Sequence, residues 1–313
     1  MTRVLEAVPN ISEGRDRAVV RDLLDVVSGF PVEVLDHSSD PDHHRSVFTF
    51  IGDPADVEDA AVALVERAAE QIDLRDHRGV HPRVGAVDVV PFVPLHGVTM
   101  ADAVQSARRV GRRLSAAGVP VWYYGAASDP PGRGLAALRR GGFEGLRDGW
   151  PSDRRPDEDG GRSGPHPTAG ITCVGARPIL LAWNVFLTGV SVEDARGIAA
   201  SIREIGGGFK GLRALGLRLQ GQDRVQVSMN LEDPVATSPL AVFDAIQGAA
   251  ERLGGQVEET EVIGMLPDTL VLPNSADRLG LSDPSVARVL SHRLSAYLAA
   301  RGAGNSQTSD TAE

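Results

Sequence analysis

Residues 76–83 bring together side chains that can move protons and bind anions. They read Asp-His-Arg-Gly-Val-His-Pro-Arg, with imidazoles at His77 and His81 and guanidinium groups at Arg78 and Arg83. Imidazole is the usual general acid or base near neutral pH, and the arginine fork binds carboxylates through paired hydrogen bonds. The pattern predicts proton transfer on an acidic substrate, and the alternative is a solvated surface loop without a catalytic role.

The same two histidines have the spacing of metal ligands. Their i, i+4 separation matches the HExxH zinc motif, which needs a helix to bring both rings to one face. Gly79 and Pro82 oppose a helix at this point. An aspartate-rich turn beside His43 and His44 could add ligands, but the spacing matches no standard zinc pattern. We expect no metal, and a metal hydrolase containing zinc stays as an alternative class.

Nucleophilic catalysis has little support in the sequence. The single cysteine, Cys173, lies in the apolar run 171–174, where a buried structural thiol is expected. There is no G-x-S-x-G or P-loop motif. Asn230, at the end of the segment 225–231, is a candidate for a polar residue facing a ligand, or else for an amide that caps a turn.

Hydrophobic periodicity predicts the elements that must position these groups. In the first half we expect strands at 4–8, 32–35, 46–51, 84–93 and 119–124, and helices at 14–28, 56–72 and 101–117. In the second half we expect strands at 179–187, 212–219, 225–231 and 257–265, and helices at 191–204, 240–253 and 284–300. Both halves contain the order βαββαβ of a ferredoxin-like unit. The predicted fold is α+β, with two ferredoxin-like subdomains side by side and a crevice between them.

The length of 313 residues favours two domains, because a single hydrophobic core rarely grows that large. Between about residues 150 and 170 the chain turns to Asp, Arg, Gly and Pro, which is typical of a linker or a binding loop. We expect an N-terminal subdomain at 1–170 that includes this segment, a C-terminal subdomain at 171–301 and a disordered tail at 302–313. Ligand sites favour domain interfaces, so the crevice is the expected site.

Composition excludes several classes of function. The net charge of −10 argues against binding to nucleic acid or to an anionic membrane, because both need a basic face. No apolar stretch approaches the roughly 20 residues that cross a bilayer, and the N-terminus lacks the apolar core of a signal peptide. We expect a cytoplasmic protein that acts on small molecules.

Several segments, in the same order along the chain, resemble the glutamate formimidoyltransferase family. They are residues 8–14, 45–50, 77–88, 91–94, 174–177, 182–185 and 226–231. The resemblance implies two ferredoxin-like subdomains with a folate-binding groove between them, in a homodimer. It also implies transfer of the formimidoyl group from N-formimidoyl-glutamate to N5 of tetrahydrofolate, the co-substrate, with release of glutamate.

The resemblance assigns roles to individual residues. His81, which stands in a His-Pro-Arg sequence, would be the general base that removes the N5 proton, without a metal. Both substrates carry glutamate carboxylates, which suit arginine clamps. The candidates for substrate and folate binding are Arg45, Arg78, Arg83, Arg177, Asn184 and Asn230. The folate-binding loop corresponds to Gly161, Arg162, Ser163, Gly164, Pro165, His166, Pro167, Thr168, Ala169 and Gly170.

The chain departs from the family pattern at two places. The acidic residue that commonly follows two positions after Asp36 is Ser38 here, so we expect Asp40 to assist the catalytic histidine instead. Residues 156–160 read Pro-Asp-Glu-Asp-Gly where the family has Pro-Asp-Phe-Gly, which leaves the register of the folate loop open by a few residues. No counterpart of the cyclodeaminase half of fused relatives is found.

The sequence is compatible with two further functions. N-formyl-glutamate differs from the formimidoyl donor by one oxygen in place of a nitrogen, so a single hydrogen bond could select it. A folate-binding protein without catalysis is the other alternative. Retention of His81 argues against it, and Ser38 argues for it.

Overall fold

The computed structural model describes residues 2–219, 221–270 and 278–307. The chain divides into two compact units, the first ending at Pro178 and the second beginning at Ile179. The sequence predicted a boundary after residue 170, whereas the boundary in the structure lies after Pro178. The reason is that strand β7 (Thr172–Ala176) pairs in parallel with two strands of the first unit. The segment 150–170 is thus a loop inside the first unit and does not link the two.

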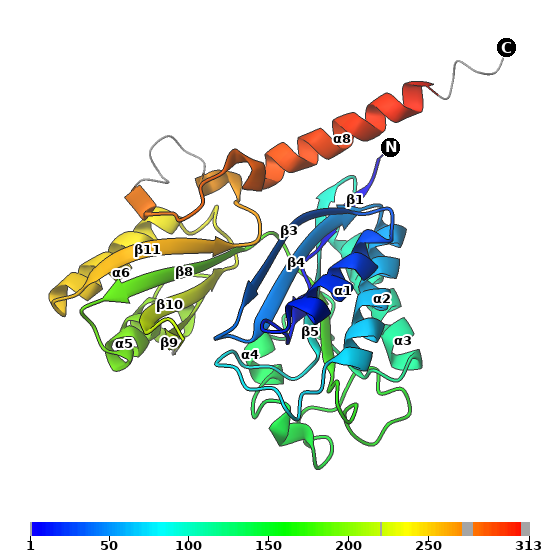
Figure 1. The fold of residues 1–313 in the computed structure, drawn as a ribbon, viewed down its shortest axis with the longest axis horizontal. Coiled ribbons are helices and arrows are strands. Elements are labelled where there is room, and N and C mark those ends of the chain that lie inside the picture. Colours follow the sequence, from blue (N-terminus) through cyan, green and yellow to red (C-terminus); the bar gives the residue numbers. More distant parts are fainter. Residues whose placement is uncertain (1, 220, 271–277, 308–313) are drawn as a thin grey trace. The chain divides into compact units, whose positions relative to one another are not determined.

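The first unit contains the predicted elements and a few additional short ones. Its other strands are β1 (Val4–Ala7), β2 (Asn10–Ile11), β3 (Glu33–Asp40), β4 (Arg45–Gly52), β5 (Val87–His96) and β6 (Val121–Gly125). Its helices are α1 (Arg17–Ser28), α2 (Pro54–Gln71), α3 (Met100–Ala116), α4 (Leu135–Leu138) and the 3-10 turn η1 (Glu144–Leu146). Figure 1 shows α1, α2 and α3 together on one face of the sheet.

Within the described residues these strands form one seven-stranded sheet. β1 and β2 are two parts of an interrupted strand between β4 and β5, and β3 pairs with β4. Pro9 lies at the interruption, where its missing N–H removes one ladder donor, while its carbonyl accepts a 3.1 Å hydrogen bond from Phe48. The order β5, β1/β2, β4, β3 is that of a ferredoxin-like unit, and β7 and β6 extend it beyond β5.

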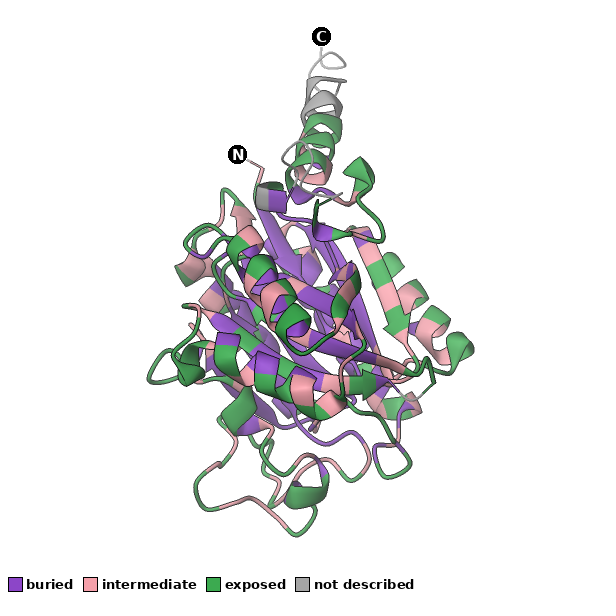
Figure 2. Cartoon of the chain, turned by 90° about the vertical axis from the view of Figure 1, so that its left-hand side faces the viewer, coloured by how far each residue is buried: buried purple, intermediate pink, exposed green. Residues whose placement is uncertain are grey.

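The core of the first unit lies between the sheet and helices α1 to α3. α2 contributes Val57, Ala60, Leu64 and Ala68, all buried, which recur at the spacing of one helix face. A smaller apolar cluster, which includes Trp122, lies around β6, β7 and α4. In Figure 2 the buried residues follow the strands, and the exposed ones lie on the outer faces of the helices.

The second unit is a complete βαββαβ fold with additions at its C-terminal end. Its elements are β8 (Leu181–Thr188), α5 (Val192–Ile202), β9 (Leu212–Leu219), β10 (Arg224–Leu231), α6 (Pro239–Arg252), β11 (Gln256–Ile263) and α8 (Leu290–Gln307), with the 3-10 turns η2 (Glu204–Gly206), η3 (Asp268–Leu270) and η4 (Val286–Arg288). The sheet order is β11, β8, β10, β9, with antiparallel pairs. The predicted α+β class with two ferredoxin-like units is thus confirmed.

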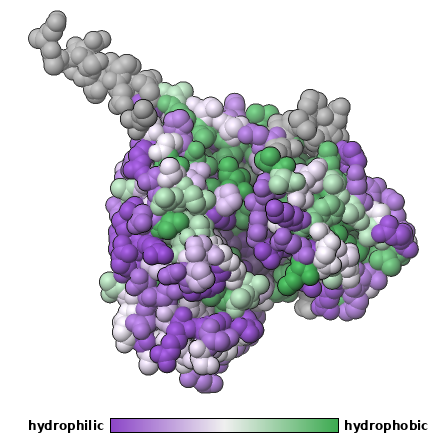
Figure 3. All heavy atoms as spheres, turned by 180° about the vertical axis from the view of Figure 1, so that it is seen from behind, coloured by the Kyte–Doolittle hydropathy of each residue, from purple (hydrophilic) through white to green (hydrophobic). Residues whose placement is uncertain are grey.

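The C-terminal helix is longer than the sequence predicted. α8 continues to Gln307, beyond residue 302 where the sequence placed the start of a tail, and residues 308–313 lie outside the described part of the chain. No helix in the described ranges is long and apolar enough to cross a membrane. Hydrophilic residues cover much of the face drawn in Figure 3, in line with a chain in which 24% of residues are charged.

Two boundaries differ from prediction in ways that shape the site. β3 continues to Asp40, where the sequence predicted a polar turn from Ser39, because it stays paired with β4 up to Arg45. β5 begins at Val87 and not at residue 84. The backbone N–H groups of residues 84 and 85 bind a side chain, so this stretch remains a loop.

Candidate active site

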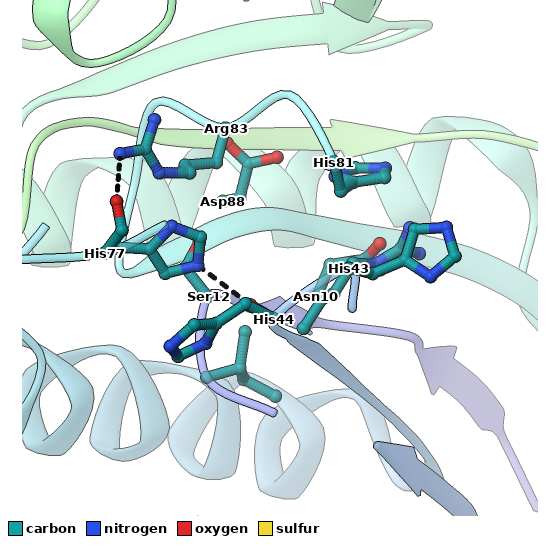
Figure 4. Close-up of a pocket in the computed structure, with 10 residues that line it drawn as sticks. Asn10, Ser12, His43, His44, His77, His81, Arg83 and Asp88 are labelled. Atoms are coloured by element: carbon teal, nitrogen blue, oxygen red, sulfur yellow. Dashed lines mark hydrogen bonds between the residues drawn. The ribbon is translucent and has the colours of Figure 1, made fainter. Parts of the chain in front are cut away.

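Histidines of the first unit gather around a small cavity at one end of its sheet (Figure 4). The cavity is lined by Asn10, Ile11, Ser12, His43, His44, Arg45, His77, His81, Arg83 and Asp88. These residues come from β2 and the residue that follows it, the β3–β4 turn, the starts of β4 and β5, and residues 76–83. We call residues 76–83 the histidine loop. The volume of the cavity is about 10 Å³, room for one water molecule. The larger parts of any substrate must therefore lie outside it.

The histidine loop is fastened to the β3–β4 turn. The Nε2 atom of His77 lies 2.8 Å from the carbonyl oxygen of His44, and the two rings are 4.2 Å apart between centroids. Gly79 lies against the backbone of the turn, where a Cβ atom would collide with the carbonyl oxygen of His43. Burial is the main cause that lowers the pKa of His77 to about 4. His77 is therefore a neutral ring that connects two backbone segments.

Asp88 anchors the chain just after the histidine loop. It is 3% exposed, and its Oδ1 accepts hydrogen bonds from the N–H groups of Val84 (2.6 Å) and Gly85 (3.3 Å). Its Oδ2 accepts a 2.8 Å hydrogen bond from Nε of Arg139, at the end of α4. A buried carboxylate is stable only when it is paired and hydrogen-bonded in this way. Asp88 thereby fixes the backbone that follows His81.

Burial, together with nearby guanidinium groups, keeps the His81 ring neutral. Burial is the largest cause that lowers its pKa well below the usual value, followed by the charges of Arg45 and Arg139 and then by His43. A neutral imidazole has a lone pair that can accept a proton. The ring of His81 is therefore neutral near neutral pH, which is the form in which a general base accepts a proton.

Arg45, at the start of β4, supplies a cation that is not fully satisfied. Its Nε is buried and meets no hydrogen-bond acceptor among the described residues. Burial, and then Arg139, lower its pKa to about 10, while Asp88 and Asp40 oppose the shift. The guanidinium therefore stays charged at neutral pH. A buried charged donor without a partner favours the binding of an anionic group.

Asp40 has a different partner from the one predicted. Its Oδ2 lies 3.1 Å from Nδ1 of His43, and its Oδ1 accepts 2.8 Å hydrogen bonds from the N–H groups of Asp42 and His43. The carboxylate that was expected to assist His81 is thus held within its own turn. It acts on the neighbouring imidazole of His43.

The other arginines predicted as clamps have partners within the protein. Arg83 lines the cavity, but its guanidinium binds Glu144 at 2.7 and 3.0 Å and the carbonyl of His77 at 3.1 Å. Arg78 is exposed and donates to carbonyls of its own loop. Arg177 follows β7 and donates to the carbonyl of the next residue. Neither Arg78 nor Arg177 lines the cavity.

The two predicted asparagines belong to the second unit. Asn184, on β8, is buried and donates a 3.2 Å hydrogen bond to Glu261. Asn230, near the end of β10, is exposed. Their roles in binding stay predictions, as does the crevice between the units.

The predicted folate loop, residues 161–170, lies in the first unit. Its residues 161–167 line a second, larger pocket of about 540 Å³ together with Arg75, Phe143 and Arg147. The end of the loop is hydrogen-bonded to the chain after His81. Ala86 donates to Ala169 (2.9 Å), and Ile171 donates to Val84 (3.0 Å). The two predicted functional loops are thus held together by backbone hydrogen bonds.

His166 closes the turn at the end of this loop. Its Nδ1 accepts a 3.0 Å hydrogen bond from the N–H of Ala169, and its backbone pairs with that of Gly170. Gly170 has φ +70°, and a Cβ atom there would collide with the carbonyl oxygen of Val84. Glycine is therefore needed at 170 both for its conformation and for space.

Sequence reasoning missed part of this arrangement. It assigned no role to Asp88 or Arg139, and it named His43 only as a possible metal ligand. A carboxylate inside the apolar run 86–93 was a usable signal for Asp88, because buried charges need partners. Arg139 lies in a polar segment far along the chain and offers no such signal.

The possible metal ligands and the single thiol were also located in the described part of the chain. No group of three or more His, Cys, Asp or Glu side chains there could hold a metal ion. Cys173 is buried, and burial raises the pKa of its thiol. It therefore stays protonated and unreactive.

Family models match both units of the chain. The N-terminal subdomain of the formiminotransferase domain matches residues 4–177, and a second formiminotransferase domain model matches residues 182–278. The division between the two matches agrees with the structural boundary after Pro178. The chain belongs to the formiminotransferase family, which confirms the resemblance seen in the sequence.

Individual relatives agree with this assignment. The chain is 40% identical over 270 residues to the glutamate formimidoyltransferase of Streptococcus pyogenes serotype M1, covering 85% of this chain and 90% of that one. It is 36% identical over 301 residues to the glutamate formimidoyltransferase of Thermoplasma acidophilum, covering 93% and 97%. It is 38% identical to the formimidoyltransferase-cyclodeaminase of Sus scrofa over 88% of this chain and 52% of that longer protein.

Proposed function

We propose that this chain transfers the formimidoyl group from N-formimidoyl-L-glutamate to N5 of tetrahydrofolate and releases L-glutamate. The observation that supports it most directly is the neutral ring of His81, which is half-buried and lines one cavity with Arg45, in a member of the formiminotransferase family. The relatives named glutamate formimidoyltransferase align over most of their own length with this chain.

The reaction is an exchange of amines at an amidine carbon. N5 of tetrahydrofolate attacks the formimidoyl carbon, and His81 accepts the proton that N5 loses. The tetrahedral intermediate then breaks its bond to the glutamate nitrogen, which takes up a proton and leaves as an amine. Such a step depends on alignment of the reactants and on proton transfer, which an imidazole supplies without a metal.

Charge in the site suits the anionic donor. Formimidoyl-glutamate carries two carboxylates, and Arg45 offers a buried charged donor that no described residue satisfies. We assign Arg45 to one of these carboxylates. The arginines with partners of their own, above all Arg83, hold the loops in place.

Tetrahydrofolate is the proposed co-substrate, and residues 161–170 are its proposed binding loop. The pocket of about 540 Å³ beside this loop is within the range of sites for small molecules. Arg75, Arg147 and Arg162 line it, which suits the carboxylates of the folate tail. A homodimer and a cytoplasmic location belong to the same proposal, and sedimentation velocity of the purified chain tests the assembly.

An assay with two donors tests the proposed function. Purified protein and tetrahydrofolate are mixed with formimidoyl-glutamate or with formyl-glutamate, and the folate product is followed by absorbance. We expect turnover with the formimidoyl donor and a loss of about 100-fold or more in kcat for His81→Ala. His292→Ala, an exposed histidine on α8, is the matched control.

Each other result selects a different function. Preference for the formyl donor would make the chain a formyltransferase. Binding of tetrahydrofolate without turnover of either donor would make it a folate-binding protein. Full activity in the His81 variant would remove that ring from its role.

A further inference from the structure

The β3–β4 turn places a second imidazole next to His81. His43 is 7% exposed, and its ring centroid lies 6.2 Å from that of His81 at an interplanar angle of 62°. Figure 4 shows these two rings at one end of the cavity, and His44 and His77 at the other. Both rings of the first pair line the cavity, so both can face one bound substrate.

The two rings stand in opposite electrostatic surroundings. His81 is next to the guanidinium groups of Arg45 and Arg139, which oppose a positive charge on its ring. His43 has the carboxylate of Asp40 at 3.1 Å from its Nδ1, and a carboxylate at that distance stabilises a positive charge. One ring beside guanidinium groups and the other beside a carboxylate is an arrangement that suits a base and an acid acting together.

We propose that His43 is the general acid of the transfer, that it protonates the leaving glutamate nitrogen, and that Asp40 positions its ring. This inference rests on the proposed function and adds a second catalytic residue to it. His81 would then serve as the base only, and the two proton transfers would be made by different rings.

The proton balance of the reaction requires both transfers. N5 forms a bond to the formimidoyl carbon while the electron pair of the C=N bond moves to the terminal nitrogen. His81 removes the proton from N5. The lone pair on the terminal nitrogen then re-forms the C=N bond while the bond between carbon and the glutamate nitrogen breaks, and the glutamate nitrogen keeps the electron pair of the broken bond. A proton from Nε2 of His43 makes it a neutral amine.

After one turnover His81 is protonated and His43 is neutral, so one proton must return between the rings. The guanidinium groups around His81 favour its loss, and the Asp40 carboxylate favours its arrival at His43. The cavity that both rings line has room for one water, which can carry the proton over a 6.2 Å centroid separation.

The state of Asp40 is consistent with this role. Burial acts to raise its pKa, yet hydrogen bonds from the ring and the backbone of His43 lower it below the usual value. The carboxylate is therefore ionised near neutral pH. The charged and titratable groups near His43 include Asp40 in the same turn and His81 in the histidine loop, and Arg45 and Asp88 line the same cavity.

Kinetics of matched variants test the assignment. Wild type, His43→Asn, His43→Ala, Asp40→Asn and, as a control, His37→Asn are compared for kcat, for both KM values and for the pH profile of kcat. His37 lies on β3 with Asp40 but is exposed and outside the cavity. Thermal unfolding of each variant verifies that it is folded.

We expect kcat of His43→Asn to fall by about 100-fold or more while both KM values change by less than about threefold. The decline of kcat at alkaline pH, which reports loss of the acid's proton, should disappear. Added imidazole should restore activity to His43→Ala, chiefly at pH values at which the added imidazole is protonated and can act as the acid. Asp40→Asn should lose about tenfold, and the His37 variant should match wild type.

Two results would overturn the inference and leave the proposed function intact. One is a His43→Asn enzyme with wild-type kcat and an unchanged alkaline decline. The other is a loss of activity that imidazole does not restore and that leaves the alkaline decline in place, since a purely structural role gives that outcome. A wild-type enzyme that does not use the formimidoyl donor would overturn both proposals.

Discussion

Asp88 accepts a 2.6 Å hydrogen bond from the backbone N–H of Val84, and this contact ends the loop that carries His81. The same carboxylate binds Arg139, whose charge is among the causes that lower the pKa of His81. One buried side chain thus influences both the position of the histidine loop and the electrostatic field at His81. Such a residue should affect stability and activity together.

The substitution Asp88→Asn keeps the size of the side chain and removes its charge. Arg139, whose side chain is 14% exposed, is then left without its partner, which costs about 3 kcal/mol or more of unfolding free energy. Urea unfolding measures this loss, and kcat/KM should fall with it. Asp153→Asn, which removes an exposed partner of Arg140, is the control and should cost less than about 1 kcal/mol. Equal losses in the two variants would contradict the role given to Asp88.

The titration of His81 should reflect its surroundings. Burial and then Arg45 are the leading causes that lower its pKa, so the free ring should reach half-protonation well below pH 6.5. In Arg45→Gln one of the opposing positive charges is gone, so the imidazolium becomes easier to form and the pKa should rise. Burial remains, so it should stay below the usual value. NMR titration measures the pKa of His81 in wild type and in Arg45→Gln, and the signal of the ring is assigned by its absence in His81→Ala. An unchanged pKa in Arg45→Gln would contradict the proximity of the guanidinium to the imidazole.

The elements of the fold were predictable because each half contains a full set of periodic segments. α2, for example, has Val57, Ala60 and Leu64 on one face, and the burial in the structure follows that pattern. The exceptions are places where a side chain replaces a ladder partner. β5 starts late because Asp88 takes the N–H groups of Val84 and Gly85, a long-range choice that no local pattern records.

Residue types alone pointed to the loop that carries His77, His81 and Arg83, and the resemblance added Arg45 and the role of His81. The structure places these residues around one cavity. The association of Asp40 with His43 was not foreseen, because it depends on β3 continuing to Asp40 and on the sharp turn that follows. His44 in that turn has φ +52°, which sequence periodicity does not report.

Arg45 should determine the affinity for the donor. Its buried Nε has no acceptor among the described residues, so a substrate carboxylate is expected to supply one. In Arg45→Gln the inhibition constant of the product L-glutamate should rise by about 30-fold or more, since truncating one partner of a buried charge pair costs about 2 kcal/mol or more. Arg45→Lys should restore little, because lysine lacks the planar fork. Arg78→Gln, at an exposed position outside the cavity, is the comparison, and an equal loss there would refute the assignment.

Gly170 should couple the predicted folate loop to the histidine loop. Alanine at this position must adopt φ +70° and also displace the carbonyl of Val84, which lies between Gly170 and the anchor Asp88. We therefore expect Gly170→Ala to raise KM for tetrahydrofolate and to lower kcat, each by about tenfold, since misplacement by 1 Å can cost up to about 100-fold. Gly254→Ala is the matched control, because it has φ +82° but open space around its Cβ. That variant pays only the conformational penalty, about 1 kcal/mol of stability, and its kinetics should equal those of wild type. If both variants lose stability alike and neither changes KM, the two loops act independently.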